Sequence, residues 1–313
     1  MITVGIDVGG TFLKAAVVAD GHLVAEYSDA VPESDVLDFV AGVAARLLVE
    51  HGADAVGVGL AGLVRWPEGV FVWGPHVSGE GIAYRSELAY RLGVPVVVDN
   101  DANLAAFAEA TAGVAVGFEH VLMLTFGTGI GAGMVFGGQI YRGRSFAGEM
   151  GHMTVQPDGL LCACGRRGCW ETLVSGARLD RLAGDLVSQA PDGTVARLVG
   201  RSIATGAHLS AAAGAGDQAA RAILAEAGEW LGRGVANLIA VLDPDVVVVG
   251  GAVAQAGRWL LDPARTAIAS HLTGSAHRES APLLEARFGR LAGSVGAALL
   301  AATTNCRPVE ERP

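Results

Sequence analysis

The chain has 313 residues, of which 51% are hydrophobic and only 17% are charged, and it contains 45 glycines. This length is sufficient for two domains with separate hydrophobic cores. The formal net charge of -10 argues against a nucleic-acid-binding protein, because such proteins present a basic face to the phosphate backbone. The chain shows neither a secretory signal nor an apolar run long enough to span a bilayer, so we expect a soluble cytoplasmic protein without nucleic-acid or membrane partners.

The first half of the chain predicts an antiparallel meander of three strands, followed by alternating helices and strands. The expected elements are strands at 4–7, 13–19 and 23–27, a helix at 37–50, a strand at 56–60, a helix at 86–92, a strand at 94–98 and a helix at 102–112. Gly9-Gly10-Thr11 connects the first two strands, and Asp20-Gly21 supplies the turn to the third.

The second half of the chain repeats this plan. The expected elements are strands at 121–126, 133–136 and 139–141, several helices, strands at 246–249 and 282–288, and a closing helix at 294–303. A second glycine loop at 127–131 takes the place of the first one. Such a repeat predicts two similar domains, and sheets flanked by helices belong to the α/β class.

The two glycine loops are candidates for binding phosphate. Residues 127–132 also satisfy the dinucleotide pattern G-x-G-x-x-A, but that motif requires a helix after the loop, and the following residues predict a strand. A Walker A loop is absent because the sequence has no Gly-Lys pair. An ordinary tight hairpin explains either loop alone, whereas two loops at matching places favour hairpins whose N–H groups hold phosphate oxygens.

Two charged residues flank the first loop. Asp7 either caps the turn or supports a magnesium ion, whose preferred ligands are carboxylate oxygens. Lys14 is either a solvent-exposed lysine or a contact for a phosphate group.

Asp99-Asn100-Asp101 ends a buried strand and begins a helix, which is where α/β folds place catalytic groups. Asn100 or Asp101 can serve simply as the N-cap of that helix. Alternatively, Asp101 is a general base that takes the proton of a substrate hydroxyl as it attacks a γ-phosphate, and Asn100 binds neighbouring hydroxyl groups. These residues alone leave both alternatives open.

Four residues have the spacing of a metal site, His-x9-Cys-x-Cys-x4-Cys. They are His152, Cys162, Cys164 and Cys169. Three thiolates and an imidazole match the closed shell of a structural zinc ion, with no position left for a catalytic water. Buried free cysteines or a disulfide are the alternatives, although nothing else indicates an oxidising compartment. The metal would bring the flanking Glu149 and Glu171 into one neighbourhood, where they can bind hydroxyl groups.

Taken together, these residues resemble the ROK family of sugar kinases and sugar-responsive repressors over nearly the whole chain. The resemblance is carried by Asp7-Val8-Gly9-Gly10-Thr11, Asp99-Asn100-Asp101-Ala102-Asn103, Gly127-Thr128-Gly129-Ile130-Gly131, Ala147-Gly148-Glu149-Met150-Gly151-His152, the segment from Cys162 to Glu171, and Gly250-Gly251. It implies the actin/hexokinase-like fold, with two RNase H-like domains around a cleft. We expect the smaller domain over residues 1–113 plus 291–313 and the larger one over 114–290.

The resemblance also implies a role for each matching residue. Asp101 matches the catalytic base of the family. The sugar-binding residues are matched by Asn100, Glu149, His152 and Glu171, and the zinc ligands by His152, Cys162, Cys164 and Cys169. Nucleotide and magnesium are expected to be bound by Asp7, Gly9, Gly10, Thr11, Lys14, Gly127, Thr128, Gly129, Gly131, Gly250 and Gly251.

The reaction implied by the resemblance is the ATP- and Mg²⁺-dependent phosphorylation of the 6-hydroxyl of a hexose, with glucose as the first choice. A structural Zn²⁺ and a homodimer or homotetramer are also implied. The repressor branch carries an N-terminal winged helix-turn-helix, whereas here the strand before the phosphate loop begins at residue 2. We therefore expect a member of the kinase branch.

Three departures from the family pattern concern the donor and the sugar. Phe12 stands where glucokinases of the family have lysine, and the lysine comes later, at Lys14, as in polyphosphate-using relatives. Arg65-Trp66 replaces an acidic residue, and the loop at 74–84 is unusual, with His76 expected to be a loop histidine and not a ligand. The alternatives are therefore an N-acetylglucosamine or N-acetylmannosamine kinase, a polyphosphate-using glucokinase, and a catalytically silent sugar sensor.

Overall fold

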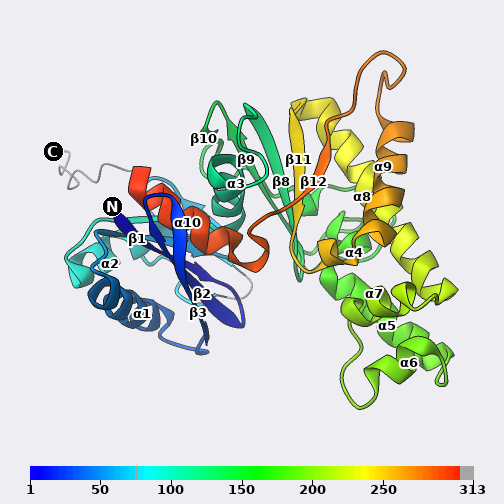
Figure 1. Cartoon of the computed structure of the whole chain (residues 1–313), viewed down its shortest axis with the longest axis horizontal. Coiled ribbons are helices and arrows are strands. Elements are labelled where there is room, and N and C mark those ends of the chain that lie inside the picture. The colour runs from blue at the N-terminus through cyan, green and yellow to red at the C-terminus, as the bar shows by residue number, and fades with distance from the viewer. Residues whose placement is uncertain (75–76, 304–313) are drawn as a thin grey trace. The chain divides into compact units, whose positions relative to one another are not determined.

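The computed structural model describes residues 1–74 and 77–303 (Figure 1). His76 and Cys306 lie outside the described residues. The chain divides into two units. The first unit comprises Met1–Met123, Gly133–Gly148 and the described part of Ala286–Pro313, and the second comprises Leu124–Ala132 and Glu149–Glu285. The domain boundaries expected from the sequence stay a prediction.

The first unit contains a five-stranded sheet with the strand order β3-β2-β1-β4-β7. Its elements are β1 (Ile2–Val8), β2 (Phe12–Ala19), β3 (His22–Ala30), α1 (Val36–His51), β4 (Ala55–Leu60), α2 (Tyr84–Leu92), β7 (Val96–Asn100), α3 (Asp101–Ala112) and α10 (Ala292–Thr303). The strands β1, β2 and β3 form the predicted antiparallel meander, whereas β1, β4 and β7 run parallel. A hairpin that the sequence did not predict, β5 (Leu63–Arg65) and β6 (Val70–Trp73), follows β4.

The second five-stranded sheet has the strand order β10-β9-β8-β11-β12, which repeats the order of the first. Its strands are β8 (His120–Phe126), β9 (Ile130–Phe136), β10 (Gln139–Ile140), β11 (Val246–Gly250) and β12 (Leu283–Glu285). The matching orders confirm the predicted internal repeat. The strand expected at 282–288 is shorter than predicted and ends at Glu285; three residues later, the Phe288 N–H donates to the Glu109 carboxylate at 2.9 Å.

The two faces of the first sheet pack against different helices. Alternate apolar residues of β1 pack with those of α1 into one hydrophobic core, as the two-residue period of a strand requires. The other face meets α10 at glycines. A Cβ at Gly5 would lie 1.9 Å from Ser294 O, and one at Gly57 would lie 2.0 Å from Ala297 O. The helix therefore packs directly on the backbone of the sheet.

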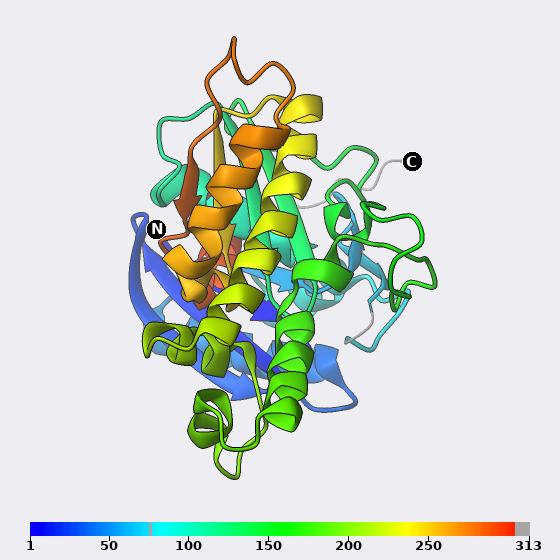
Figure 2. The same ribbon diagram turned by 90° about the vertical axis from the view of Figure 1, so that its right-hand side faces the viewer.

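In the second unit, the helices α8 and α9 form a closely packed pair. The helices of this unit are α4 (Glu171–Val174), α5 (Gly176–Gln189), α6 (Thr194–Val199), α7 (Gly206–Gly214), α8 (Gln218–Leu242) and α9 (Arg258–His271). Figure 2 shows α8 in yellow and α9 in orange lying side by side. Their backbones approach at Gly228 and Gly232, where an added Cβ would lie 2.3 Å from a carbonyl oxygen of α9. Across the described ranges, no helix has both the length and the apolar content needed to cross a lipid bilayer.

Replacing Gly57 by alanine is expected to lower the free energy of unfolding by about 1–3 kcal/mol, because the added methyl group would overlap Ala297 O. Gly42→Ala is the matched control, since a Cβ at this position in α1 has no neighbour within 4 Å. Alanine there should raise stability by roughly 0.5–1 kcal/mol. Urea unfolding measures both variants, and an unchanged midpoint for Gly57→Ala would contradict the packing of α10 on β4.

Candidate functional site

The second unit gathers the four predicted metal ligands. One ligand atom from each of the four side chains lies within 4.8 Å of the others; the residues are His152, Cys162, Cys164 and Cys169. The Sγ atoms of Cys164 and Cys169 are 3.6 Å apart, which is longer than a disulfide bond. Three thiols and an imidazole that converge in this way fit a tetrahedral zinc ion with no open position.

The segment that carries the cysteines is anchored in the second unit by Trp170. Its side chain is fully buried, and it occupies the space left by Gly234 of α8, where a Cβ would lie 2.1 Å from the indole. The indole N–H donates to a carbonyl of α8 at 2.9 Å, and the ring contacts Phe126 edge to face with centroids 5.9 Å apart. Because Trp170 stands between Cys169 and Glu171, this anchor holds a predicted metal ligand and a predicted sugar-binding carboxylate together.

Two carboxylates flank the imidazole of His152. His152 Nε2 lies 3.9 Å from Glu149 Oε2, and His152 Nδ1 lies 3.5 Å from Glu171 Oε1. Burial raises the pKa of Glu149, the charge of His152 opposes this shift, and the charge of Glu171 adds to it. The arrangement offers several hydrogen-bond acceptors in one place, as a group of sugar hydroxyls requires.

The Cys162 thiol donates to Glu171 Oε1 at 2.9 Å. Burial, and then this hydrogen bond, raise the pKa of the thiol. A metal ion binds the thiolate and would displace this proton, so that Glu171 Oε1 becomes available to another donor.

The second glycine loop runs beside these residues. The loop connects β8 to β9, so the predicted hairpin is confirmed and the dinucleotide-binding alternative, which needs a helix there, is wrong. The Gly127 carbonyl accepts the Gly176 N–H at 2.7 Å. A Cβ at Gly129 would lie 2.5 Å from Glu171 Oε2, so the loop passes directly against this carboxylate. Thr128 and Gly131 belong to the same connection.

Gly250-Gly251, at the end of β11, lies beside the start of this loop. Gly251 has a φ of 87°, and a Cβ there would lie 2.3 Å from Phe126 O, so only glycine fits. The second unit therefore brings together the metal cluster, both flanking acids, the second glycine loop and Gly250-Gly251.

The first unit holds the first glycine loop and its two charged neighbours. Gly9-Gly10-Thr11 connects β1 to β2, as predicted. Asp7 and Lys14 are paired across these strands, with Asp7 Oδ2 and Lys14 Nζ 3.7 Å apart. Burial raises the pKa of Asp7, and the lysine opposes this shift. Lys14 is thus the ion-pair partner of a buried acid, and its contact with a phosphate group stays a prediction.

Asn100 is the N-cap of α3 and Asp101 is its first residue. Asn100 Oδ1 accepts the N–H groups of Ala102 and Asn103 at 2.9 and 3.0 Å. Its Nδ2 donates to Gly62 O and to Asp101 Oδ1, both at 3.1 Å. All four hydrogen-bonding positions of the amide are therefore used. The capping alternative is confirmed for Asn100, and its part in sugar binding stays a prediction.

Asp101 is half-buried, and its carboxylate is oriented by one backbone donor and one side-chain donor. Asp101 Oδ1 accepts the Ala102 N–H at 2.9 Å in addition to the Asn100 amide. The strand register places Asp7 and Asp99 on one row, on either side of Gly59. The carboxyl ends of three parallel strands thus bring Asp7 and the start of α3 to one edge of the sheet.

A buried ion pair that the sequence analysis missed adjoins Asp101. Asp99 is only 2% exposed, and Arg142 Nε and Nη2 lie 2.7 and 2.6 Å from Asp99 Oδ2. The guanidinium stacks on the Trp66 ring, 3.8 Å from its centroid. An acid at the end of a buried strand indicates that a cation lies nearby in the fold, but the sequence does not indicate which residue supplies that cation.

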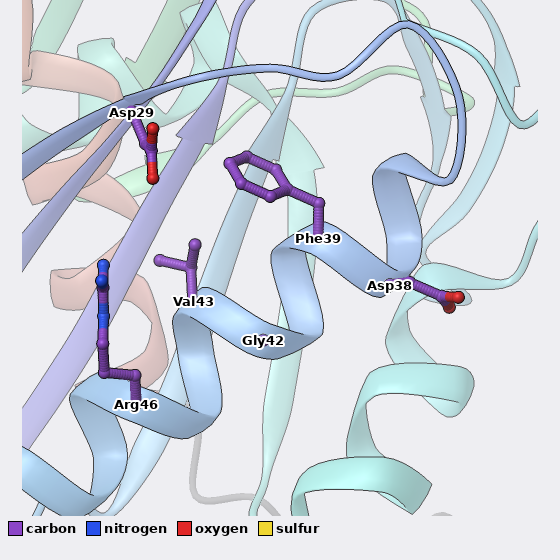
Figure 3. A pocket seen from close by; sticks show the side chains of 6 residues that line it. All are labelled: Asp29, Asp38, Phe39, Gly42, Val43 and Arg46. Carbon is purple, nitrogen blue, oxygen red and sulfur yellow. The ribbon is translucent and has the colours of Figure 1, made fainter.

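A hollow of about 250 Å³ lies between β3 and α1 (Figure 3). Its lining residues are Asp29, Asp38, Phe39, Gly42, Val43 and Arg46. Figure 3 shows Asp38 turned away from the hollow, and this carboxylate pairs with Arg91. None of the predicted site residues lines the hollow, so it does not belong to the candidate site.

Comparison with known proteins identifies relatives along the whole chain. A model of the ROK family matches residues 3–304. The glucokinase of Streptomyces coelicolor is 35% identical over 314 aligned residues, which cover 96% of this chain and 97% of that protein. The crystal structure of a ROK family glucokinase from Streptomyces griseus in complex with glucose and AMPPNP is 37% identical, with a TM-score of 0.88 over 96% of this chain and 99% of that one. The ROK hexokinase of Thermus thermophilus is 35% identical, with a TM-score of 0.77 over 96% and 98% of the two chains.

These similarities and the repeated sheet order establish the predicted actin/hexokinase-like fold.

Purified protein is expected to contain about one zinc ion per chain, because the converging Cys₃His set forms a closed tetrahedral shell. Cys164→Ser should lose most of the metal, whereas Cys306→Ser, which alters the cysteine outside this segment, should retain it. Elemental analysis after gel filtration measures the content. Zinc-free wild-type protein, or full occupancy in Cys164→Ser, would contradict the assignment.

Proposed function

The chain belongs to the ROK family, and we propose that it is an ATP-dependent glucokinase that phosphorylates the 6-hydroxyl of glucose. The observation that carries the proposal is the position of Asp101. It begins α3 at the carboxyl edge of the first sheet, with its carboxylate oriented by two hydrogen bonds. The glucokinase of Streptomyces coelicolor and the Streptomyces griseus glucokinase that binds glucose and AMPPNP support the choice of sugar and donor.

We propose that Glu149, His152 and Glu171 bind the hydroxyl groups of the sugar. Both carboxylates lie within 3.9 Å of the imidazole, and hydrogen bonds from hydroxyl groups to ionised carboxylates are short and strong. Asn100 can bind a sugar hydroxyl only if that hydroxyl replaces one of its present partners, since its amide is fully hydrogen-bonded.

Asp101 is the proposed general base. Its carboxylate takes the proton from the 6-hydroxyl while that oxygen forms a bond to the γ-phosphorus, and the bond from the γ-phosphorus to the bridging oxygen breaks to leave ADP. Asn100 and Ala102 both donate to Asp101 Oδ1, and these two contacts fix the orientation of the carboxylate group.

The backbone N–H groups of both glycine loops are proposed to bind the phosphate oxygens of ATP, and Gly250-Gly251 to contact its adenosine end. When bound, ATP supplies the phosphoryl group and Mg²⁺ neutralises charge on its phosphates. Asp7 fits a supporting role toward magnesium, because it is a buried acid whose raised pKa a nearby cation would lower. Without a metal ion, the positive charge of Lys14 compensates the negative charge of the Asp7 carboxylate.

The zinc ion is assigned a structural role. Its ligands His152, Cys162, Cys164 and Cys169 leave no coordination position for water or substrate. The metal would instead hold the segment between Glu149 and Glu171, and so the two proposed sugar-binding acids. The expected homodimer or homotetramer stays a prediction that size-exclusion chromatography with light scattering can measure.

A short series of assays distinguishes the rival functions. Sugar-dependent ADP release with glucose supports the glucokinase, and release only with N-acetylglucosamine or N-acetylmannosamine moves the proposal to an amino-sugar kinase. Glucose 6-phosphate formed from polyphosphate but not from ATP changes the donor. A thermal shift with sugar and no phosphoryl transfer from any donor indicates a sensor.

Asp101→Asn is expected to lower kcat by about two to four orders of magnitude, because the amide cannot take the proton. Sugar affinity should change little. Asp185→Asn, at an exposed position on α5, is the matched control and should keep wild-type turnover. Coupled measurement of ADP release with Mg-ATP and glucose provides both constants. Near-normal turnover in Asp101→Asn would remove the assigned base.

Gly129→Ala is expected to weaken sugar binding by about tenfold or more, because its methyl group would lie 2.5 Å from Glu171 Oε2 and displace that carboxylate. Gly184→Ala, in α5, is the control, since a Cβ there meets no atom within 4 Å. Calorimetry with glucose in the absence of nucleotide isolates this effect from any change in phosphate binding. Equal affinities of the two variants would argue against Glu171 as a sugar ligand.

A further inference from the structure

We propose that Arg142 is a positioning residue for the reaction: it holds Asp99, and through Asp99 it sets the orientation of the Asp101 carboxylate. This inference rests on the proposed function of Asp101 as the general base. All the residues involved belong to the first unit. They come from three segments, namely the end of β7 with the start of α3, the hairpin after β4, and the chain that follows β10.

Asp99 uses both of its carboxylate oxygens to join these segments. Its Oδ1 accepts the Asn100 N–H at 2.8 Å and the Asn103 Nδ2 at 3.1 Å. Its Oδ2 is bound by Arg142 through Nε and Nη2, at 2.7 and 2.6 Å. The carboxylate is thus tied to the first turn of α3 on one side and to Arg142 on the other. Because Asp99 is buried, its negative charge depends on Arg142 for compensation.

Arg142 is itself held in one orientation. Its Nη1 donates to Ile140 O at 3.2 Å, and its guanidinium plane stacks on the Trp66 ring at 3.8 Å from the centroid. Trp66 is fixed in turn by Ser145, which accepts the Trp66 N–H at 3.1 Å and donates to Trp66 O at 3.3 Å. The Arg142 side chain is only 13% exposed, so water does not easily replace these contacts.

The contacts reach Asp101 through Asn100. The backbone N–H of Asn100 binds Asp99, and its side-chain Nδ2 binds Asp101 Oδ1. Removal of Arg142 would leave a buried charge at Asp99 without a cation, and this carboxylate would then change its position. Because Asp99 already binds the Asn100 N–H, Asn100 would move with it and release Asp101 Oδ1.

The geometry requires arginine and not only a positive charge. Arg142 uses two nitrogens on one carboxylate oxygen, a third on a carbonyl, and its flat face on an indole. A lysine ammonium can supply the charge but neither the planar stack nor the paired contact. Arg142→Lys should therefore recover only part of the function lost in Arg142→Gln.

The test compares Arg142→Gln and Arg142→Lys with Arg144→Gln, which changes an exposed arginine two residues away. We expect Arg142→Gln to lower kcat by about 10- to 100-fold at saturating glucose and ATP, with the KM for glucose changed less than about threefold. Arg142→Lys should lie between this variant and the wild type, and Arg144→Gln should match the wild type. Asp99→Asn/Arg142→Gln should recover part of kcat, because no buried charge remains unpaired.

Hydrogen exchange at the Ala102 and Asn103 amides, measured without ligands, is the second readout. Faster exchange in Arg142→Gln than in Arg144→Gln is expected, whether or not the chain turns over a sugar. This separates the two proposals: a wild type without sugar-dependent turnover refutes the kinase, while exchange still tests the anchoring by Arg142.

Wild-type kcat in folded Arg142→Gln, or exchange unchanged from the control, would overturn the inference. A lower melting temperature with unaltered kcat would show a purely structural role and would overturn it as well. If Arg142→Gln does not fold, Arg142→Lys and the double variant decide by the same two measurements.

Discussion

Both units depend on contacts of backbone with backbone or with a large side chain, and these contacts exist only where a Cβ is missing. Gly57 lets α10 lie on the first sheet, and Gly234 makes room for the indole of Trp170. The same constraint shapes the candidate site, because Gly129 brings the second loop against Glu171. A methyl group at Gly57 would displace α10 from the sheet, whereas one at Gly234 or Gly129 would displace Trp170 or Glu171 and so disturb the candidate site.

The few charges inside the first unit are each matched by a partner. Asp7 faces Lys14 across two strands, Asp99 is held by Arg142, and the Glu109 carboxylate accepts the N–H groups of Val114 and Phe288. Since an unpaired buried charge is strongly destabilising, such acids specify a single local arrangement. Two of these acids, Asp7 and Asp99, lie in register on either side of Gly59, close to the carboxyl ends of their strands, and Asp99 precedes the proposed base by two residues. Of these contacts, the one between Asp99 and Arg142 is also the one that we propose to orient Asp101.

The predicted elements that the structure confirms are those with strong local patterns. The meander around the first glycine loop, its repeat in the second half and the helix at 102–112 all follow from alternation, periodicity and turn residues. The β5–β6 hairpin was missed because its strands have three and four residues, too few for a pattern to emerge. The strand at 282–288 was overestimated: it ends at Glu285, and the Phe288 N–H binds Glu109, a residue that lies far away along the chain.

By itself, the sequence determined the α/β class, the internal repeat, the Cys₃His ligand set and the acid at the start of α3, because each of these is written in residues close together along the chain. Only the tertiary structure decided that Lys14 pairs with Asp7 and that Glu171 lies against Gly129. It also decided that the Asn100 side-chain amide caps α3 with its oxygen and binds Gly62 O and Asp101 with its nitrogen. It also selected Arg142 as the partner of Asp99, at a separation of 43 residues. The physical reason is that a buried acid demands a cation without encoding which one; the strand order and the closure of loops make that choice.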